Sequence, residues 1–127
     1  MGLFKKRSEQ EKVDMNERSP QLGLKYKDLA VLGQLMSAGA DLTQQRHVIY
    51  YSYAPSEDVA REMAREAEGH GYTAEVREPL AQLPDQWSLV CEITTVTSPD
   101  VVRGADDFFE DLAKRHGAEF DGWEASL

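Results

Sequence analysis

The sequence predicts an α+β fold of the ferredoxin-like type, a βαββαβ sandwich that follows one extra N-terminal helix. The first observation is the order of the apolar periods, which reads strand, helix, strand, strand, helix, strand after that extra helix. The second is that residues 46–53 and 87–96, which such a fold places at the centre of its sheet, are the longest and most apolar strand candidates. Glycine and proline lie between the segments and mark the expected turns.

The chain divides into an arm and one domain. At 127 residues with 41% hydrophobic content, it can build a single core. Residues 1–24 mix both charge signs with Ser, Asn and Gln and show no apolar period, which is typical of a flexible arm. We therefore expect a mixed-charge arm over residues 1–24 and a single ferredoxin-like domain over residues 25–127.

The domain is expected to begin with a helix, a strand and a second helix. Residues 25–38 predict a short amphipathic helix that packs on an edge or on the open face of the sheet. Its apolar stripe consists of Leu29, Leu32, Leu35 and Met36. Residues 46–53 are apolar or aromatic on both faces, as in an interior strand. The second helix opens at Pro55 and Ser56 and ends at Gly69.

The second half of the domain is expected to supply two strands and a third helix. Residues 72–77 alternate between apolar and polar side chains, which suits a strand with one wet face. Residues 87–96 form the longest strand candidate. Ser98 and Pro99 are a favourable helix start, with Ser98 as the cap, and Gly117 ends that helix.

The last strand is expected over residues 118–124, where the chain terminus would otherwise fray. Two large aromatic residues, Phe120 and Trp123, indicate that this end is docked on the domain. Gly122 between them permits a bulge or a tight bend. We therefore predict an edge strand that completes the sheet.

Charge is distributed unevenly along the chain. Seven of the 14 basic and four of the 23 acidic residues lie in residues 1–27, so residues 28–127 carry 7 basic and 19 acidic side chains and a net charge of −12. A body of this charge repels a phosphate backbone, which disfavours nucleic acid, and it suits a basic partner protein. The alternative is that the acidity only maintains solubility.

Cysteine content and hydropathy indicate the compartment. Cys91 is the only cysteine, so no intramolecular disulfide is possible, and its apolar surroundings in sequence suit a small apolar filler. No apolar run reaches the roughly 20 residues that span a bilayer, and the first residues lack the apolar core of a signal peptide. We expect a cytoplasmic protein without membrane association.

Acidic residues gather on the two helices that are expected to cover the sheet. With the terminal tryptophan they make up the candidate partner-binding residues, which are Asp106, Asp107, Glu110, Asp111, Glu62, Glu66 and Trp123. Like charges one helical turn apart cost about 0.2–0.5 kcal/mol per pair. One interpretation is a docking surface for a basic segment of a partner. The alternative is a solvated helix face that needs no partner.

No pattern in the sequence indicates catalysis, a cofactor or a metal. The three histidines, His47, His70 and His116, lack the spacing of a metal site. Serine-hydrolase elbows, phosphate-binding glycine loops and dinucleotide fingerprints are absent from the sequence. We therefore expect a protein that is not an enzyme, with no catalytic, cofactor-binding or metal-binding residues.

RNA binding by the open face of the sheet is an alternative. RNA-recognition motifs share this order of elements and stack bases on aromatic residues of the two central strands. Tyr50, Tyr51, Tyr53 and Trp87 lie on the equivalent segments. The ribonucleoprotein signature and a basic stripe are both missing, so core packing or cover by the first helix explains these aromatic residues as well.

Four stretches together carry a resemblance to a known family. They are Gly39-Ala40-Asp41-Leu42, the first strand from Arg46 to Tyr51, the Ala/Glu-rich helix closing on Gly71-Tyr72, and Phe120-Asp121-Gly122-Trp123-Glu124. Over roughly residues 28–126 the chain resembles the family of the regulator of ribonuclease activity B, the protein inhibitors of ribonuclease E. The resemblance implies a small acidic ferredoxin-like protein without catalytic residues. It also implies binding to ribonuclease E or a related endoribonuclease or degradosome protein, which modulates RNA turnover by protein–protein contact.

Three classes of function follow from the sequence. The first is a non-enzymatic regulator that binds a ribonuclease through an acidic surface, or an adaptor for an unrelated basic partner. The second is an RNA-binding module that uses the open sheet face. The third is a small-ligand domain or an unrecognised enzyme, which requires a polar pocket that the sequence does not indicate.

Overall fold

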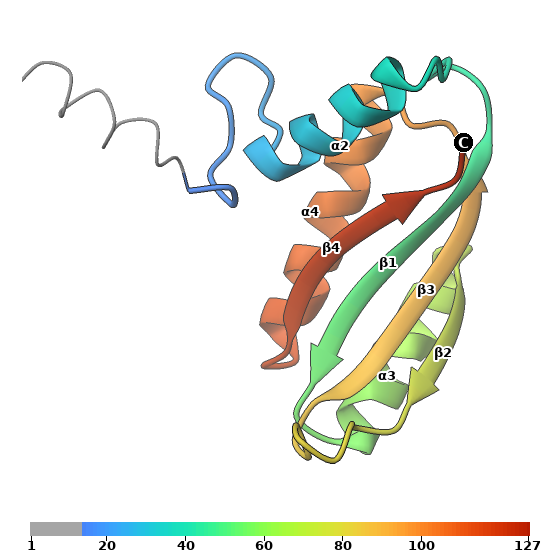
Figure 1. Cartoon of the computed structure of the whole chain (residues 1–127). Helices are drawn as coiled ribbons and strands as arrows, with labels where there is room; N and C mark the ends of the chain where they lie inside the picture. The colour runs from blue at the N-terminus through green and yellow to red at the C-terminus, as the bar shows by residue number, and fades with distance from the viewer. Residues whose placement is uncertain (1–13) are drawn as a thin grey trace, which may run out of the picture.

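The computed structural model describes residues 14–127, in which helices flank a four-stranded antiparallel sheet (Figure 1). The elements follow one another as α2 (Tyr26–Ser37), β1 (Arg46–Ala54), α3 (Glu57–Gly69), β2 (Thr73–Arg77), β3 (Trp87–Thr95), α4 (Pro99–Arg115) and β4 (Glu119–Ala125). The strands lie in the order β2-β3-β1-β4. This order confirms the predicted α+β, ferredoxin-like fold with an extra helix before β1. Of the helices within residues 14–127, none is both long enough and apolar enough to cross a membrane.

The sheet has one covered and one open face. Helices α3 and α4 lie against one face, and the face turned to the viewer in Figure 1 is covered by no helix of residues 14–127. Along β1, Val48, Tyr50 and Ser52 are buried beneath the helices, whereas Ile49 and Tyr51 between them are partly exposed. Because β1 pairs with β3 on one side and β4 on the other, it is the interior strand that its two apolar faces predict.

Aromatic side chains fill the space between the sheet and the helices. Phe109 of α4 is fully buried and stacks on Tyr50 and Phe120, with ring centroids 4.7 Å and 5.4 Å apart. Tyr72 meets Phe109 edge-on at 5.0 Å. Cys91 is buried in the same core, and this burial raises the pKa of its thiol to about 12. The thiol therefore stays protonated and acts as the apolar filler that the sequence predicts.

Strand β4 lies at one edge of the sheet, as predicted for the terminal strand. Its register with β1 shifts between Tyr51 and Ser52, so that Asp121 has no partner on β1. Gly122 follows with a φ of +123°, a conformation that side chains other than glycine rarely adopt. The bulge expected at Gly122 is confirmed. It lies beside α2, where Lys27 Nζ donates a hydrogen bond to the carbonyl oxygen of Asp121 at 3.2 Å.

Helix α2 packs beside α4 and over the end of β4, so it occupies the sheet edge rather than the open face. Leu32 and Leu35 of α2 form an apolar cluster with Leu24 and Val102. Trp123 of β4 contacts both this cluster and the main core. The tryptophan thus joins the extra helix to the ferredoxin-like body.

One local prediction is wrong, and a second is confirmed only in position. Met36, expected on the inner stripe of α2, is 60% exposed although it follows the buried Leu32 by one helical turn, because it lies in the last turn, next to Ser37 where the helix ends. Ser98 occupies the N-cap position of α4 but its side chain makes no capping hydrogen bond. Pro99 at the first helical position has the φ of a helix and so fixes the start of α4, and Ser98 contributes its carbonyl oxygen, which accepts a hydrogen bond from the Val102 N–H at 3.0 Å. At α3, in contrast, Ser56 Oγ accepts a hydrogen bond from the Val59 N–H at 3.2 Å.

The described part of the predicted arm contacts the domain. Within residues 14–24, Leu24 is fully buried and Ser19 is 6% exposed. Arg18 forms an isolated antiparallel bridge with Lys25, which folds this stretch back on itself ahead of α2. Residues 1–13, the remainder of the predicted arm, lie outside the described residues. The domain boundary at residues 24 and 25 stays a prediction.

Candidate functional site

Three of the acidic candidates meet where the C-terminal halves of α3 and α4 lie side by side. This outer acidic cluster consists of Glu62 and Glu66 of α3 and Asp111 of α4. Arg115 Nη2 lies 2.9 Å from Glu66 Oε1, and Arg115 Nε donates a hydrogen bond to Asp111 Oδ2 at 2.8 Å. His116 hydrogen-bonds to Glu66, and its Nδ1 lies 3.7 Å from Glu62 Oε2. The hydrogen bonds from Arg115 and His116 lower the pKa of Glu66, so its carboxylate is ionised at neutral pH.

The other acidic candidates on α4 surround a buried lysine. Lys25 Nζ lies 3.1 Å from Asp106 Oδ1 and 3.0 Å from Glu110 Oε2. Arg18 Nη2 lies 3.1 Å from Asp106 Oδ2 and 2.7 Å from Asp107 Oδ1. Lys25 is 3% exposed and Asp106 1% exposed, whereas Glu110 and Asp107 reach the surface. We call the buried pair Lys25 and Asp106, together with Arg18 on its solvent side, the buried ionic cluster; the side chain of Arg18 is 34% exposed. Its carboxylate lies beneath the surface, so of the acidic candidates in this group only Asp107 and Glu110 face solvent.

A second buried carboxylate, Asp28 of α2, belongs to the same region. Its Oδ1 accepts a hydrogen bond from Trp123 Nε1 at 2.9 Å, while its Oδ2 has no hydrogen-bond partner among residues 14–127. Burial, followed by the negative charge of Asp106, raises the pKa of Asp28 from 3.8 to about 6. Trp123, a candidate binding residue, therefore uses its indole N–H within the domain.

The raised pKa of Asp28 predicts a pH-dependent stability. Because the folded chain holds this proton more tightly than the unfolded chain, the contribution of Asp28 to the free energy of unfolding falls as the pH rises from about 4 to about 6. Asp28→Asn keeps an acceptor for Trp123 and removes the charge. We expect this variant to be more stable than the wild type by about 1–2 kcal/mol at pH 8, and to lose that advantage at pH 4.

Urea unfolding of both proteins at pH 4, 6 and 8 measures this difference. All other carboxylates are common to the two proteins, so the change in their stability difference isolates Asp28. A stability difference that is the same at all three pH values would contradict the assignment of the titration to Asp28.

The open face of the sheet offers only part of what the RNA-binding alternative requires. Tyr51 and Tyr53 are half-buried on this face, but Tyr50 is buried in the core beneath the helices and Trp87 is partly buried against that core. The Tyr51 hydroxyl donates a hydrogen bond to Glu124 Oε1 at 2.6 Å, which raises the pKa of the phenol. A stacking surface for single-stranded RNA combines aromatic rings with cations. The charge of Arg77 acts on Tyr51, but Arg77 is paired with Glu75 at 3.1 Å, and the side chain that is hydrogen-bonded to Tyr51 is the anion Glu124.

Sequence reasoning identified Asp106 as a surface residue and missed its cationic partners. Arg18 lies in the predicted arm and Lys25 at the first position of the predicted helix, and neither position indicates a partner for Asp106. Asp28 was also missed. Its signal is the spacing of residues 28, 32 and 35, which places the carboxylate on the same face of α2 as two buried leucines.

The match to a known protein family begins and ends with the fold. A family model described as Regulator of ribonuclease activity B matches residues 26–125. This span begins at the first residue of α2 and ends at the last residue of β4. Arg18 and Lys25 precede it. A search of curated proteins finds no similar sequence.

Proposed function

The chain belongs to the family of the regulator of ribonuclease activity B, and on this premise we propose that it binds a ribonuclease and modulates RNA turnover without catalysing a reaction itself. The proposed partner is ribonuclease E or a related endoribonuclease or degradosome protein. The observation that carries the proposal is the family match over every helix and strand of residues 26–125. The net charge of −12 over residues 28–127 supports a partner with a basic segment.

The proposed contact surface is the outer side of α3 and α4. It consists of the outer acidic cluster together with Asp107 and Glu110. The side chains of Asp107 and Asp111 are 62% and 66% exposed, and both already accept hydrogen bonds from arginines of this chain. Carboxylates held in this way suit the planar guanidinium of a partner's arginine, which can share or replace the internal partner. Such charges accelerate encounter and select the partner.

A triple substitution tests this surface. We expect Glu62→Gln, Asp107→Asn and Asp111→Asn together to weaken binding to the purified ribonuclease by roughly 10- to 100-fold, since each exposed ion pair contributes at most about 1 kcal/mol. The matched control carries Glu75→Gln, Glu78→Gln and Asp85→Asn, which remove the same charge from exposed positions in β2 and in the loop that follows it. Titration calorimetry gives the affinity, and cleavage of a structured RNA by the ribonuclease gives its regulation.

The possible results test the proposed partner and the proposed contact surface separately. Triple and control variants that bind equally well would contradict the proposed surface. A wild-type chain that neither binds the ribonuclease nor changes its cleavage rate would contradict the proposed partner. Capture of a different basic protein from the host by the wild type, but not by the triple variant, would support the adaptor alternative.

A further inference from the structure

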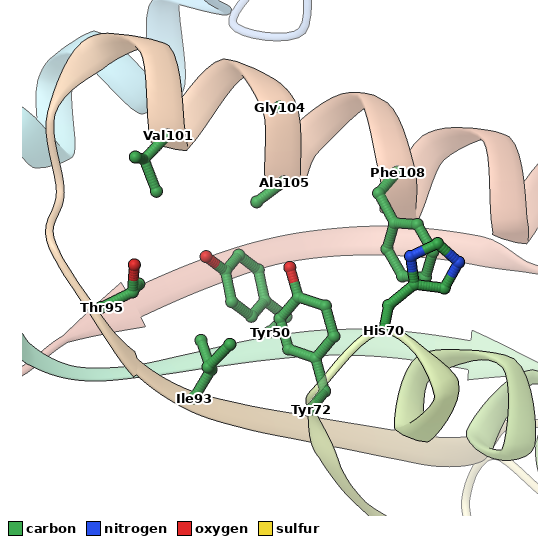
Figure 2. A pocket seen from close by; sticks show the side chains of 9 residues that line it. All are labelled: Tyr50, His70, Tyr72, Ile93, Thr95, Val101, Gly104, Ala105 and Phe108. Carbon is green, nitrogen blue, oxygen red and sulfur yellow. The ribbon is translucent and has the colours of Figure 1, made fainter.

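A cavity of about 290 Å³ lies between α4 and the sheet (Figure 2). Tyr50 of β1 and Thr95 of β3 line its floor, and Tyr72 and His70 enter from the connection between α3 and β2. Phe108 lies on the side of α4. The volume is close to the lower end of the range for small-molecule pockets.

Three hydroxyl groups line this cavity without a side-chain hydrogen bond to any residue of 14–127. They belong to Tyr72, Thr95 and Tyr50, and Tyr50 is 4% exposed. Figure 2 shows the three oxygens directed towards the space beneath α4. Desolvation raises the pKa of both phenols, so they remain hydrogen-bond donors at neutral pH. None of the three oxygens is among the fully buried unpaired polar atoms of the described chain, so each reaches solvent through the cavity and can donate a hydrogen bond to a bound acceptor.

The walls of the cavity favour a flat ring. Phe108 stacks on Tyr72 with ring centroids 5.7 Å apart at an interplanar angle of 15°, and His70 lies 4.5 Å from Phe108. Tyr50 is fixed on its other side by Phe109 at 4.7 Å. These ring contacts hold the walls in place and leave apolar surface for a further ring.

The lack of carboxylates and strong cations in the lining of the cavity disfavours charged ligands. None of the residues that line the cavity is an aspartate, glutamate, lysine or arginine, and His70 offers only an imidazole, so a charged ligand would lose its hydration without gaining a strong counter-ion. The charges of Asp28 and Asp106 also act on the Tyr50 hydroxyl, which disfavours an anion further.

We propose that this cavity binds an uncharged aromatic molecule that carries a carbonyl or another hydrogen-bond acceptor. The ring lies against Phe108 and Tyr72, and the acceptor receives hydrogen bonds from Tyr50 and a neighbouring hydroxyl. This site goes beyond ribonuclease binding, which the acidic outer surface supports independently.

Three probes that share one ring test the charge selectivity. Benzamide is uncharged, whereas benzoate is an anion and benzylamine a cation at pH 7. We expect benzamide to shift the amide resonances of Tyr50, Tyr72 and Thr95 in the full chain saturably, with a dissociation constant in the millimolar range for a ligand of this size. Benzoate and benzylamine bind at least about tenfold more weakly because each must shed a full charge's hydration.

Tyr50→Phe tests the hydrogen bond. Because the hydroxyl has no partner within the described chain, the melting temperature is unchanged or higher, while affinity for benzamide falls by roughly 3- to 10-fold. A structural hydroxyl would give the opposite pattern, with a lower melting temperature and unchanged affinity, and that result overturns the proposal.

Gly104→Leu tests the space. Gly104 lies on the exposed side of the cavity, a Cβ atom there meets nothing within 4 Å, and leucine favours the helix more than glycine. We expect a stable variant that loses benzamide binding. Gly33→Leu is the matched control, because Gly33 lies in α2 with equal space and outside the cavity.

Two results would overturn the proposal. One is the absence of saturable benzamide binding to the wild type, and the other is undiminished benzamide binding to Gly104→Leu. If the wild type does not bind benzamide and Gly104→Leu also loses ribonuclease binding, the small-molecule proposal is overturned. The cavity would then be where a side chain of the partner protein binds.

Discussion

Replacing Lys25 by methionine should lower the free energy of unfolding by about 3–5 kcal/mol. Lys25 is almost fully buried and lies within 3.1 Å of Asp106 and 3.0 Å of Glu110. Methionine fills much of the same volume but leaves the buried carboxylate of Asp106 with Arg18 as its one remaining cation in the cluster. Urea unfolding at pH 7 measures the loss. Lys114→Met, an exposed lysine of α4, is the control and should change stability by less than about 0.5 kcal/mol.

A double variant separates the lost charge pair from lost packing. Lys25→Met combined with Asp106→Asn leaves no uncompensated ion in the core, so we expect it to recover most of the stability that Lys25→Met loses. If the double variant were less stable than the single one, Asp106 would contribute through its other contacts rather than through Lys25. A loss below about 1 kcal/mol for Lys25→Met would show that solvent reaches this pair.

The order of the elements could be predicted because each strand and helix has its own local period. Val48 and Tyr50 alternate with Ile49 and Tyr51, and this alternation predicts a strand whichever neighbours it pairs with. The edge position of β4 could be predicted from topology, because two right-handed strand-helix-strand units place the first and third strands at the centre of the sheet. Local chemistry also located the bulge, because Gly122 adopts a backbone conformation that few other residues tolerate.

The buried ionic cluster shows where sequence reasoning fails. Asp106 lies one helical turn from Val102 and Phe109, on the face of α4 that enters the core. Its residue type predicts exposure, and its position predicts burial. A charged side chain such as Asp106 can be buried only if a cation pairs with it. Its two cations, Lys25 and Arg18, lie 81 and 88 positions earlier in the chain. Tertiary placement of two distant segments is not encoded in either local pattern.

The cavity is hidden from the sequence for a related reason. Tyr50, Tyr72 and Thr95 come from three different segments, and each was correctly expected near a strand. Their hydroxyl groups converge because strands β1 and β3 pair directly and the connection from α3 to β2 passes beside them. Whether side chains leave a gap depends on the volumes of all the residues that meet at that point. The apolar periodicity of a single segment contains no information about those volumes.

Trp123→Ala should lower the free energy of unfolding by about 3 kcal/mol, the lower end of the range for large aromatic residues, because the ring is only partly buried against the core. The ring contacts both apolar clusters, so its removal opens a gap between α2 and the body of the domain. It also leaves Asp28 without the hydrogen bond at 2.9 Å, when the other carboxylate oxygen already lacks a partner among the described residues. Thermal and urea unfolding measure the effect. Unchanged stability with lost ribonuclease binding would instead place Trp123 in the partner interface.

Trp123→Phe separates the ring from the N–H group. Phenylalanine retains most of the packing but donates no hydrogen bond, so we expect a smaller loss of about 1–3 kcal/mol. The indole N–H lowers the pKa of Asp28, and its removal raises that pKa further above 6. A carboxyl group with a higher pKa in the folded state contributes less stability as the pH rises, so the loss caused by Trp123→Phe should be larger at pH 8 than at pH 4. Equal losses at both pH values would mean that the ring alone, and not its hydrogen bond to Asp28, fixes the terminal strand.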